Sequence, residues 1–288
     1  MRVPVSPRRD DVVSLRDGRT LAFAEWGDPD APPLFFFHGA PGSRVWPIER
    51  TGATRPARLI TVDRPGYGRS DPHPGAAVAT WAEDVAELAD RLSLERFALA
   101  GWSMGGPFAL AVAARLPERV TRVGLASMSR IPPDEGHGAV ELLPPPLREK
   151  LEEARTEPDV LVELWPEEEF WRGFEDPEKV FDLLPEVDQW VAADADARAV
   201  LVESMREGLR SGIQGMVREE VMLLRPWGFA LSDIHTPVEL WHGDADRVPL
   251  ARPEFIVGRL LDGRLNVWSG EGHCALLRRW DEIVASLT

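Results

Sequence analysis

A serine between two glycines lies where the hydrophobic pattern of the sequence changes. Residues 97–100 are typical of a buried strand, and apolar residues at helical spacing follow from Met104. Between them lies Gly101-Trp102-Ser103-Met104-Gly105, a Gly-x-Ser-x-Gly motif. A sharp turn from strand to helix would lift the serine hydroxyl out of the sheet, and glycines leave room where strand and helix nearly touch. The motif therefore predicts a nucleophilic Ser103.

Such a serine needs a base and an acid that orients the base, because its alkoxide is too basic to form unaided near neutral pH. His273 lies between a strand predicted at 265–268 and a final helix predicted from Ala275. A loop in that place reaches the sheet edge where Ser103 is expected. We therefore predict His273 as the base, in preference to the other histidines. These are His38, His73, His137, His235 and His242.

Two aspartates follow the strand predicted at 238–241 and are candidates for the orienting acid. We predict Asp246 for this role and keep Asp244 as the alternative. Either carboxylate is also suited to cap a helix predicted near 250–261.

A tetrahedral oxyanion would need two backbone N–H donors. Met104 directly follows the predicted nucleophile, and Ala40 lies in the loop His38-Gly39-Ala40-Pro41-Gly42, after a strand predicted at 34–37. We predict the N–H groups of Ala40 and Met104 as the donors, with a simple tight turn as the alternative for that loop. Trp102, His38 and Gly39 are predicted substrate-pocket residues.

Strands and helices alternate through most of the chain, which predicts a mostly parallel sheet with helices on both faces. Asp17-Gly18 predicts a hairpin between two N-terminal strands. Thr80 to Glu83 has the form of a capping box at the start of a helix. Further strands are predicted at 59–62 and 120–126.

The pattern changes between residues 129 and 232, where prolines, acidic residues and helical segments replace strands. We interpret residues 1–128 and 233–288 as one α/β core and residues 129–232 as a helical cap. Aromatic and methionine residues of the cap would line an acyl pocket or simply hold the cap on the core. They are Trp165, Phe170, Trp171, Phe174, Phe181, Trp190, Met205, Met216 and Trp227.

Composition narrows the expected partners and compartment. The formal net charge of −15 disfavours nucleic acid and anionic membranes as partners. The single cysteine, Cys274, permits no intrachain disulfide, and the N-terminus lacks the apolar run of a signal peptide. We expect a cytoplasmic protein with a small-molecule substrate, and we leave open whether it forms a homodimer.

Five motifs together resemble the α/β-hydrolase family. They are HGAPGSR (38–44), DRPGYGRSD (63–71), GWSMGG (101–106), GDAD (243–246) and GEGH (270–273). The resemblance implies an α/β fold with an eight-stranded, mostly parallel sheet flanked by helices, a helical cap inserted after the sixth strand, and no metal or organic cofactor. One departure is the short run from Asp246 to Pro249, because many relatives carry an extra residue there.

Members of this family with other chemistry need residues that this chain lacks. Haloalkane dehalogenases and epoxide hydrolases use an aspartate nucleophile where this chain has Ser103, and the cap tyrosines of epoxide hydrolases are missing because the only tyrosine is Tyr67. We expect a serine hydrolase that cleaves a small carboxylic ester through an acyl-enzyme. The alternatives are an aminopeptidase of the proline iminopeptidase type, a hydrolase of carbon–carbon bonds, and a small-molecule receptor on the same fold.

Overall fold

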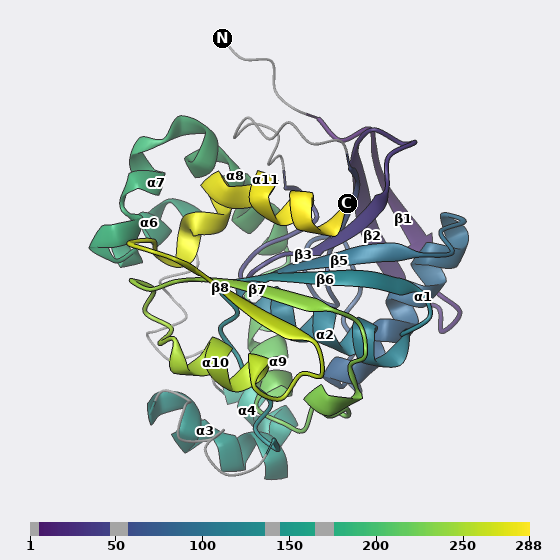
Figure 1. The fold of residues 1–288 in the computed structure, drawn as a ribbon. Helices are drawn as coiled ribbons and strands as arrows, with labels where there is room; N and C mark the ends of the chain where they lie inside the picture. Colours follow the sequence, from purple (N-terminus) through teal and green to yellow (C-terminus); the bar gives the residue numbers. More distant parts are fainter. Residues whose placement is uncertain (1–5, 47–56, 136–144, 165–175) are drawn as a thin grey trace.

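An eight-stranded sheet forms the centre of the molecule (Figure 1). The computed structural model describes residues 6–46, 57–135, 145–164 and 176–288. The strand order is β1-β2-β4-β3-β5-β6-β7-β8; β2 runs antiparallel to both of its neighbours and all other pairs are parallel. The strands are β1 (Arg9–Ser14), β2 (Thr20–Gly27), β3 (Pro33–Phe37), β4 (Arg58–Val62), β5 (Phe97–Trp102), β6 (Val120–Ala126), β7 (Val238–Gly243) and β8 (Gly263–Trp268). The predicted eight-stranded, mostly parallel sheet is confirmed.

Helices cover both faces of the sheet (Figure 1). Those of the core are α1 (Trp81–Arg91), α2 (Gly106–Arg115), α10 (Ala251–Val257) and α11 (Leu276–Leu287). Those between β6 and β7 are α3 (Pro145–Thr156), α4 (Pro158–Leu164), α6 (Val180–Leu183), α7 (Trp190–Ala193), α8 (Ala195–Gly208) and α9 (Gln214–Leu223). Buried residues of α11 and α8 lie on one face, and those of α1, α2, α9 and α10 on the other.

The apolar run in β3 serves both layers of the core. Phe35 and Phe37 pack on the side of α1 and α2, whereas Leu34 and Phe36 pack on the side of α11. Side chains alternate between the faces of a strand, so a strand covered on both faces needs apolar residues at every position. This explains why the sequence there shows no polar alternation.

The hairpin prediction is confirmed, and the capping-box prediction is wrong. Strands β1 and β2 pair across the turn that contains Gly18, whose φ is +89°. Thr80 belongs to a single 3₁₀ turn (Val78–Thr80) that precedes α1, and its hydroxyl bonds to the backbone of Ala77 instead of capping α1. The helix continues from an existing turn, so its first amides do not need a threonine cap.

Residues 129–232, which we call the inserted segment, are helical wherever the structure forms regular elements within the described part. The division of the chain into an α/β core and a helical cap remains a prediction. Of its aromatic and methionine residues, Phe181, Met205, Met216 and Trp227 are buried and Trp190 is partly buried against the core, which favours packing over pocket lining. Trp165, Phe170, Trp171 and Phe174, like His137, lie outside the described residues.

A buried ion pair fastens the inserted segment to the core. The Arg64 guanidinium, after β4, donates to both carboxylate oxygens of Glu219 on α9 at 2.6 and 2.7 Å, and the two side chains are 0% and 3% exposed. The hydroxyl of Tyr67 also donates a hydrogen bond to Glu219, at 3.2 Å. Two charges out of contact with water are tolerated only when each is paired and hydrogen-bonded.

Two pairs of glycines bring the inserted segment into backbone contact with core loops. A Cβ atom on Gly208, at the end of α8, would collide with the carbonyl of Gly42. A Cβ atom on Gly66 would lie 3.0 Å from the Cα atom of Gly215, at the start of α9. The loops after β3 and β4 therefore form the seat of the inserted segment.

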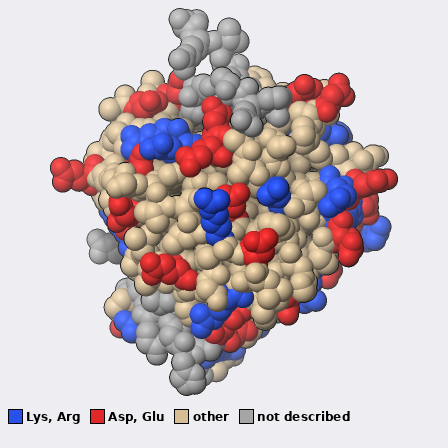
Figure 2. Space-filling view, in the orientation of Figure 1, with Lys and Arg blue, Asp and Glu red and all other residues tan. Residues whose placement is uncertain are grey.

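Charged side chains of both signs are interspersed on the face shown in Figure 2. Exposed ion pairs also occur in the inserted segment, as between Arg198 and Glu178, whose side chains are both more than 40% exposed. Among the helices that the structure describes, none is long and apolar enough to cross a membrane.

We predict that Glu219→Gln lowers the free energy of unfolding by about 3 kcal/mol, because it leaves the buried Arg64 charge without its counter-charge. Urea denaturation measures the change. Glu178→Gln is the matched control, since it breaks an exposed ion pair in the same segment and should cost less than about 1 kcal/mol. Equal losses in the two variants would contradict the prediction.

Candidate active site

Ser103 occupies a strained turn directly after β5. The strand ends at Trp102, a 3₁₀ turn spans Ser103–Gly105, and α2 begins at Gly106. The φ angle of Ser103 is +53°, a region that is costly for residues other than glycine. The sequence predicted a helix from Met104; the regular helix instead starts two residues later, after this turn.

The glycines of the motif permit this turn because other backbone lies against them. A Cβ atom on Gly101 would lie 2.9 Å from the carbonyl oxygen of Gly105 and from the Cα atom of Gly106. A Cβ atom on Gly105 would collide with the carbonyl of Phe37 in the neighbouring strand. The predicted close approach of strand and helix at Gly101 is confirmed. At Gly105 it is the backbone of β3 that leaves no room for a side chain.

The structure brings Ser103, His273 and Asp246 into one hydrogen-bonded series. Nε2 of His273 lies 2.9 Å from Oγ of Ser103, and Nδ1 lies 2.8 Å from Oδ2 of Asp246. His273 begins a 3₁₀ turn (His273–Ala275) before α11, and Asp246 lies in the loop after β7. With the Nδ1 proton donated to the carboxylate, Nε2 is free to accept the serine proton.

The geometry favours Asp246 over its alternative. The carboxylate of Asp244 accepts the backbone N–H of Gly270 at 2.6 Å and supports the loop before His273. The second oxygen of Asp246 accepts the N–H of Val248 at 2.9 Å, and its side chain is fully buried. Helix α10 starts after Leu250 without a side-chain cap, so neither aspartate caps it.

The charges of this pair stabilise each other. Burial acts to raise the pKa of Asp246, but attraction by His273 and its hydrogen bond outweigh burial, and the pKa falls below its usual value. Burial acts to lower the pKa of His273, yet Asp246 raises that pKa above 6.5. An imidazolium formed by proton transfer from Ser103 would therefore be stabilised where it forms.

The loop after β3 lies on the other side of Ser103. A Cβ atom on Gly39 would lie 3.4 Å from the Cβ of Ser103 and 3.0 Å from the ring of Trp102. The indole N–H of Trp102 donates to the carbonyl of His273 at 3.1 Å. Ala40 follows Gly39 directly, and the oxyanion role of the Ala40 and Met104 N–H groups remains a prediction.

His38 does not support its prediction as a pocket residue. Its ring is 1% exposed, packs edge-on against Tyr67, and has Nδ1 2.6 Å from the carbonyl oxygen of Gly39. Burial and the Arg64 charge hold the pKa of His38 well below its ordinary value, so the ring is neutral and structural. His242, the other histidine that directly follows or ends a strand, is buried with Nε2 2.7 Å from the carbonyl oxygen of Val248.

Two residues near the site were not identified from the sequence. Oγ of Ser129, after β6, lies 3.4 Å from Oγ of Ser103, and the carbonyl of Ser129 accepts from Arg252 at 2.7 Å. Asp188, in the inserted segment, accepts the backbone N–H of His273 at 2.9 Å. For Ser129 the available signal was its place after a parallel strand, whereas nothing in the pattern around Asp188 indicates where its side chain points.

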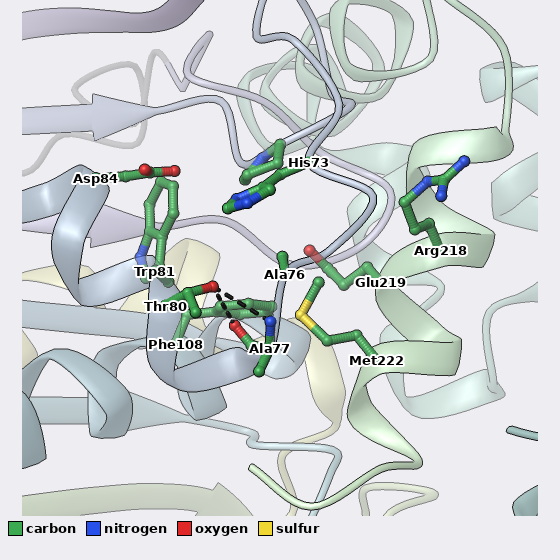
Figure 3. A pocket seen from close by; sticks show the side chains of 11 residues that line it. His73, Ala76, Ala77, Thr80, Trp81, Asp84, Phe108, Arg218, Glu219 and Met222 are labelled. Atoms are coloured by element: carbon green, nitrogen blue, oxygen red, sulfur yellow. Dashed lines mark hydrogen bonds between the residues drawn. The ribbon is translucent and has the colours of Figure 1, made fainter. Parts of the chain in front are cut away.

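A pocket between α1 and α9 is separate from these residues. Figure 3 shows Trp81 and Asp84 of α1 on one side and Arg218 and Met222 of α9 on the other. Its volume of about 10 Å³ is no larger than one water molecule needs, and its lining contains neither Ser103 nor His273. Among the described residues, no group of three or more His, Cys, Asp or Glu side chains is arranged to hold a metal ion.

Known proteins with a similar sequence or structure share this fold. Residues 32–156 match the α/β-hydrolase-fold family. The structure of an esterase from Exiguobacterium antarcticum superposes with a TM-score of 0.66 over 97% of this chain and 98% of that one, at 21% sequence identity. At that identity the likeness concerns the fold alone.

Curated relatives are similar over a shorter part. A proline iminopeptidase of Arabidopsis thaliana is 30% identical over 41% of this chain and 32% of its own length. A non-heme chloroperoxidase of Streptomyces lividans is 34% identical over 42% of this chain and 45% of its own length. The chain thus spans less than half the length of these relatives, and their names do not fix a substrate.

The choice between the two aspartates is testable through the reactivity of Ser103 toward a fluorophosphonate. We predict that Asp246→Asn slows phosphonylation by about 10⁴-fold, because the amide favours the wrong imidazole tautomer. Asp244→Asn, the matched control, should leave the rate near that of the unaltered protein. Mass spectrometry of the labelled chain over time gives both rates, and the reverse ranking would refute the assignment.

The raised pKa of His273 predicts the pH range of this reactivity. Only the neutral imidazole accepts the serine proton, so the rate should fall tenfold per pH unit below the pKa of His273. The midpoint should lie above 6.5, the value of an unperturbed histidine. A pH series of phosphonylation rates measures it, and a midpoint at or below 6.5 would contradict the charge balance described above.

Proposed function

We propose that this chain, which has the α/β-hydrolase fold, is a serine hydrolase that cleaves a small, mostly uncharged carboxylic ester through an acyl-enzyme. The observation that carries the proposal is the pair of hydrogen bonds, 2.9 and 2.8 Å long, that joins Ser103 to His273 and His273 to Asp246. The N–H of Val248 holds the Asp246 carboxylate, and the side chains of Asp188 and Trp102 bind the backbone of His273, so little reorganisation is needed before attack.

In the first half of the reaction, Oγ of Ser103 attacks the ester carbonyl while Nε2 of His273 takes the serine proton. The carbon–oxygen bond to the leaving group then breaks, and His273 returns the proton to the leaving alcohol. In the second half, a water molecule gives a proton to His273 and attacks the acyl carbon. The bond between that carbon and Oγ of Ser103 then breaks, His273 returns the proton to Oγ, and the acid is released. Asp246 keeps the Nδ1 proton in place throughout.

Negative charge on the tetrahedral intermediate is stabilised by backbone donors. The N–H of Met104 lies at the start of the turn that leads into α2, and a helix N-terminus favours negative charge nearby. The N–H of Ala40 comes from the loop whose Gly39 lies against Ser103 and Trp102. Since Pro41 cannot donate, Ala40 supplies the donor from that side.

The inserted segment acts in this proposal as the cap over the site. Support comes from its contacts with loops that carry site residues. Ser204 of α8 accepts the N–H of Ser43 at 2.9 Å, and Asp188 accepts the N–H of His273 at 2.9 Å. A cap placed in this way determines which acyl and leaving groups reach Ser103.

A peptidase of the proline iminopeptidase type is the second candidate. It is favoured by the relatives of that name, including one from Neisseria gonorrhoeae that is 34% identical over 45% of this chain. The two candidates share the acyl-enzyme steps and differ in the leaving group, which is an alcohol in one and an amine in the other. A panel of short-chain aryl esters and aminoacyl arylamides therefore separates them.

We predict that Ser103→Ala lowers turnover of the best ester by about 10⁶-fold, because no other group in the series forms the acyl-enzyme. Circular dichroism should remain that of the unaltered protein. If the variant cleaves the esters as well as the unaltered protein does, the proposal is wrong. If the protein instead binds a small molecule saturably without turnover, and Ser103→Ala does not change that binding, the alternative of a small-molecule receptor on this fold is favoured.

A further inference from the structure

Asp188 connects the inserted segment to the backbone of the predicted base. It ends a 3₁₀ turn (Glu186–Asp188) between α6 and α7, and its side chain is inaccessible to solvent. One carboxylate oxygen accepts the N–H of His273 at 2.9 Å, and the other accepts the N–H of Cys274 at 3.0 Å. These are the first amides of the turn that leads into α11, so Asp188 caps that turn from a distant part of the chain.

The capped turn has no side chain of its own that could replace Asp188. The residue in the capping position is Gly272, which has no side chain. A Cβ atom there would lie 2.5 Å from Cγ of Asp188, so the carboxylate occupies the space that a side chain would need. A glycine and a buried aspartate 84 positions apart in the chain therefore form one unit.

The charge of Asp188 also acts on His273. Among the described residues, no arginine or lysine forms an ion pair with it; the titratable groups that face it are His273, Asp246 and Cys274. Burial raises the pKa of the Cys274 thiol, which stays neutral. Burial raises the pKa of Asp188 above its ordinary value, although the two amide hydrogen bonds and His273 act to lower it. An ionised Asp188 favours the imidazolium form of His273, in addition to Asp246.

We propose that Asp188 is a positioning residue by which the inserted segment holds His273 in the orientation that joins Ser103 to Asp246. The inference rests on the proposed role of His273 as the base for Ser103. Asp188 holds the backbone of His273 and Cys274 through two hydrogen bonds, and it places a carboxylate from the inserted segment beside the imidazole that serves Ser103.

The test uses the full chain and a fluorophosphonate, so it needs no knowledge of the substrate. Asp188→Asn keeps the size of the side chain but removes the charge and one of the two acceptors. We expect phosphonylation at its pH plateau to slow by at least about 30-fold, which corresponds to about 2 kcal/mol. We also expect the acid limb to move to lower pH, because loss of a nearby negative charge lowers the pKa of His273.

Asp194→Asn is the matched control. Asp194 also lies in the inserted segment and also accepts two backbone amides, those of Asp196 and Ala197, at the start of α8. It should lower thermal stability without moving the acid limb. If Asp188→Asn leaves both the plateau and the acid limb unchanged, or if Asp194→Asn shifts the limb equally, the inference is overturned.

Two further measurements keep the test decisive. If Asp188→Asn fails to fold, Gly272→Ala places a methyl group against the carboxylate while retaining Asp188, and it too should slow phosphonylation; an unchanged rate would refute the inference. If the unaltered protein does not react with the fluorophosphonate at all, the proposed function fails. NMR titration of the His273 ring then tests the effect of Asp188 on its own, with a lower pKa expected in Asp188→Asn and an unchanged pKa contradicting it.

Discussion

The hydrogen bond between His273 and Ser103 depends on how closely backbone packs at one edge of the sheet. Parallel strands β5, β7 and β8 all end at this edge, so the loops that carry Ser103, Asp246 and His273 converge there. Convergence brings the loops near each other, but a 2.9 Å contact also requires Ser103 to leave the sheet at a positive φ angle. Gly101 and Gly105 allow this, because any side chain there would collide with neighbouring backbone.

The loops after β3 and β4, which carry two of the sequence motifs, contact the inserted segment as well as the candidate site. Arg64 and Tyr67 hold Glu219 of α9, and the backbones at Gly42 and Gly66 contact α8 and the start of α9 without intervening side chains. The same loop that contains Gly42 also presents Gly39 to Ser103. The loop after β3 therefore contacts both the inserted segment and Ser103, so a change in the conformation of this loop would affect both.

Charge is distributed around His273 in opposing groups. Asp246 and Asp188 favour its protonated form, whereas Arg130 disfavours that form. Arg252, which binds the carbonyl of Ser129 beside Ser103, has its pKa lowered to about 10 by burial and by the Arg130 charge. The carboxylates prevail, so the pKa of His273 is raised even though burial acts against it.

The sequence by itself predicted most strands and helices and the turn at Ser103, because local periodicity and glycine requirements are properties of short segments. It also predicted His273 as the base, from its place after a strand, but it left two aspartates as candidates for the acid. The sequence wrongly predicted that Thr80 caps the helix that follows, because Thr80 lies in a 3₁₀ turn before that helix. It also predicted His38 as a pocket residue, although His38 is buried. Only the tertiary structure separated Asp246 from Asp244, since both fit the same loop pattern. It alone revealed Asp188, because the direction of a side chain in an irregular helical segment is decided by what packs against it, and its partners lie more than 80 residues away in the chain.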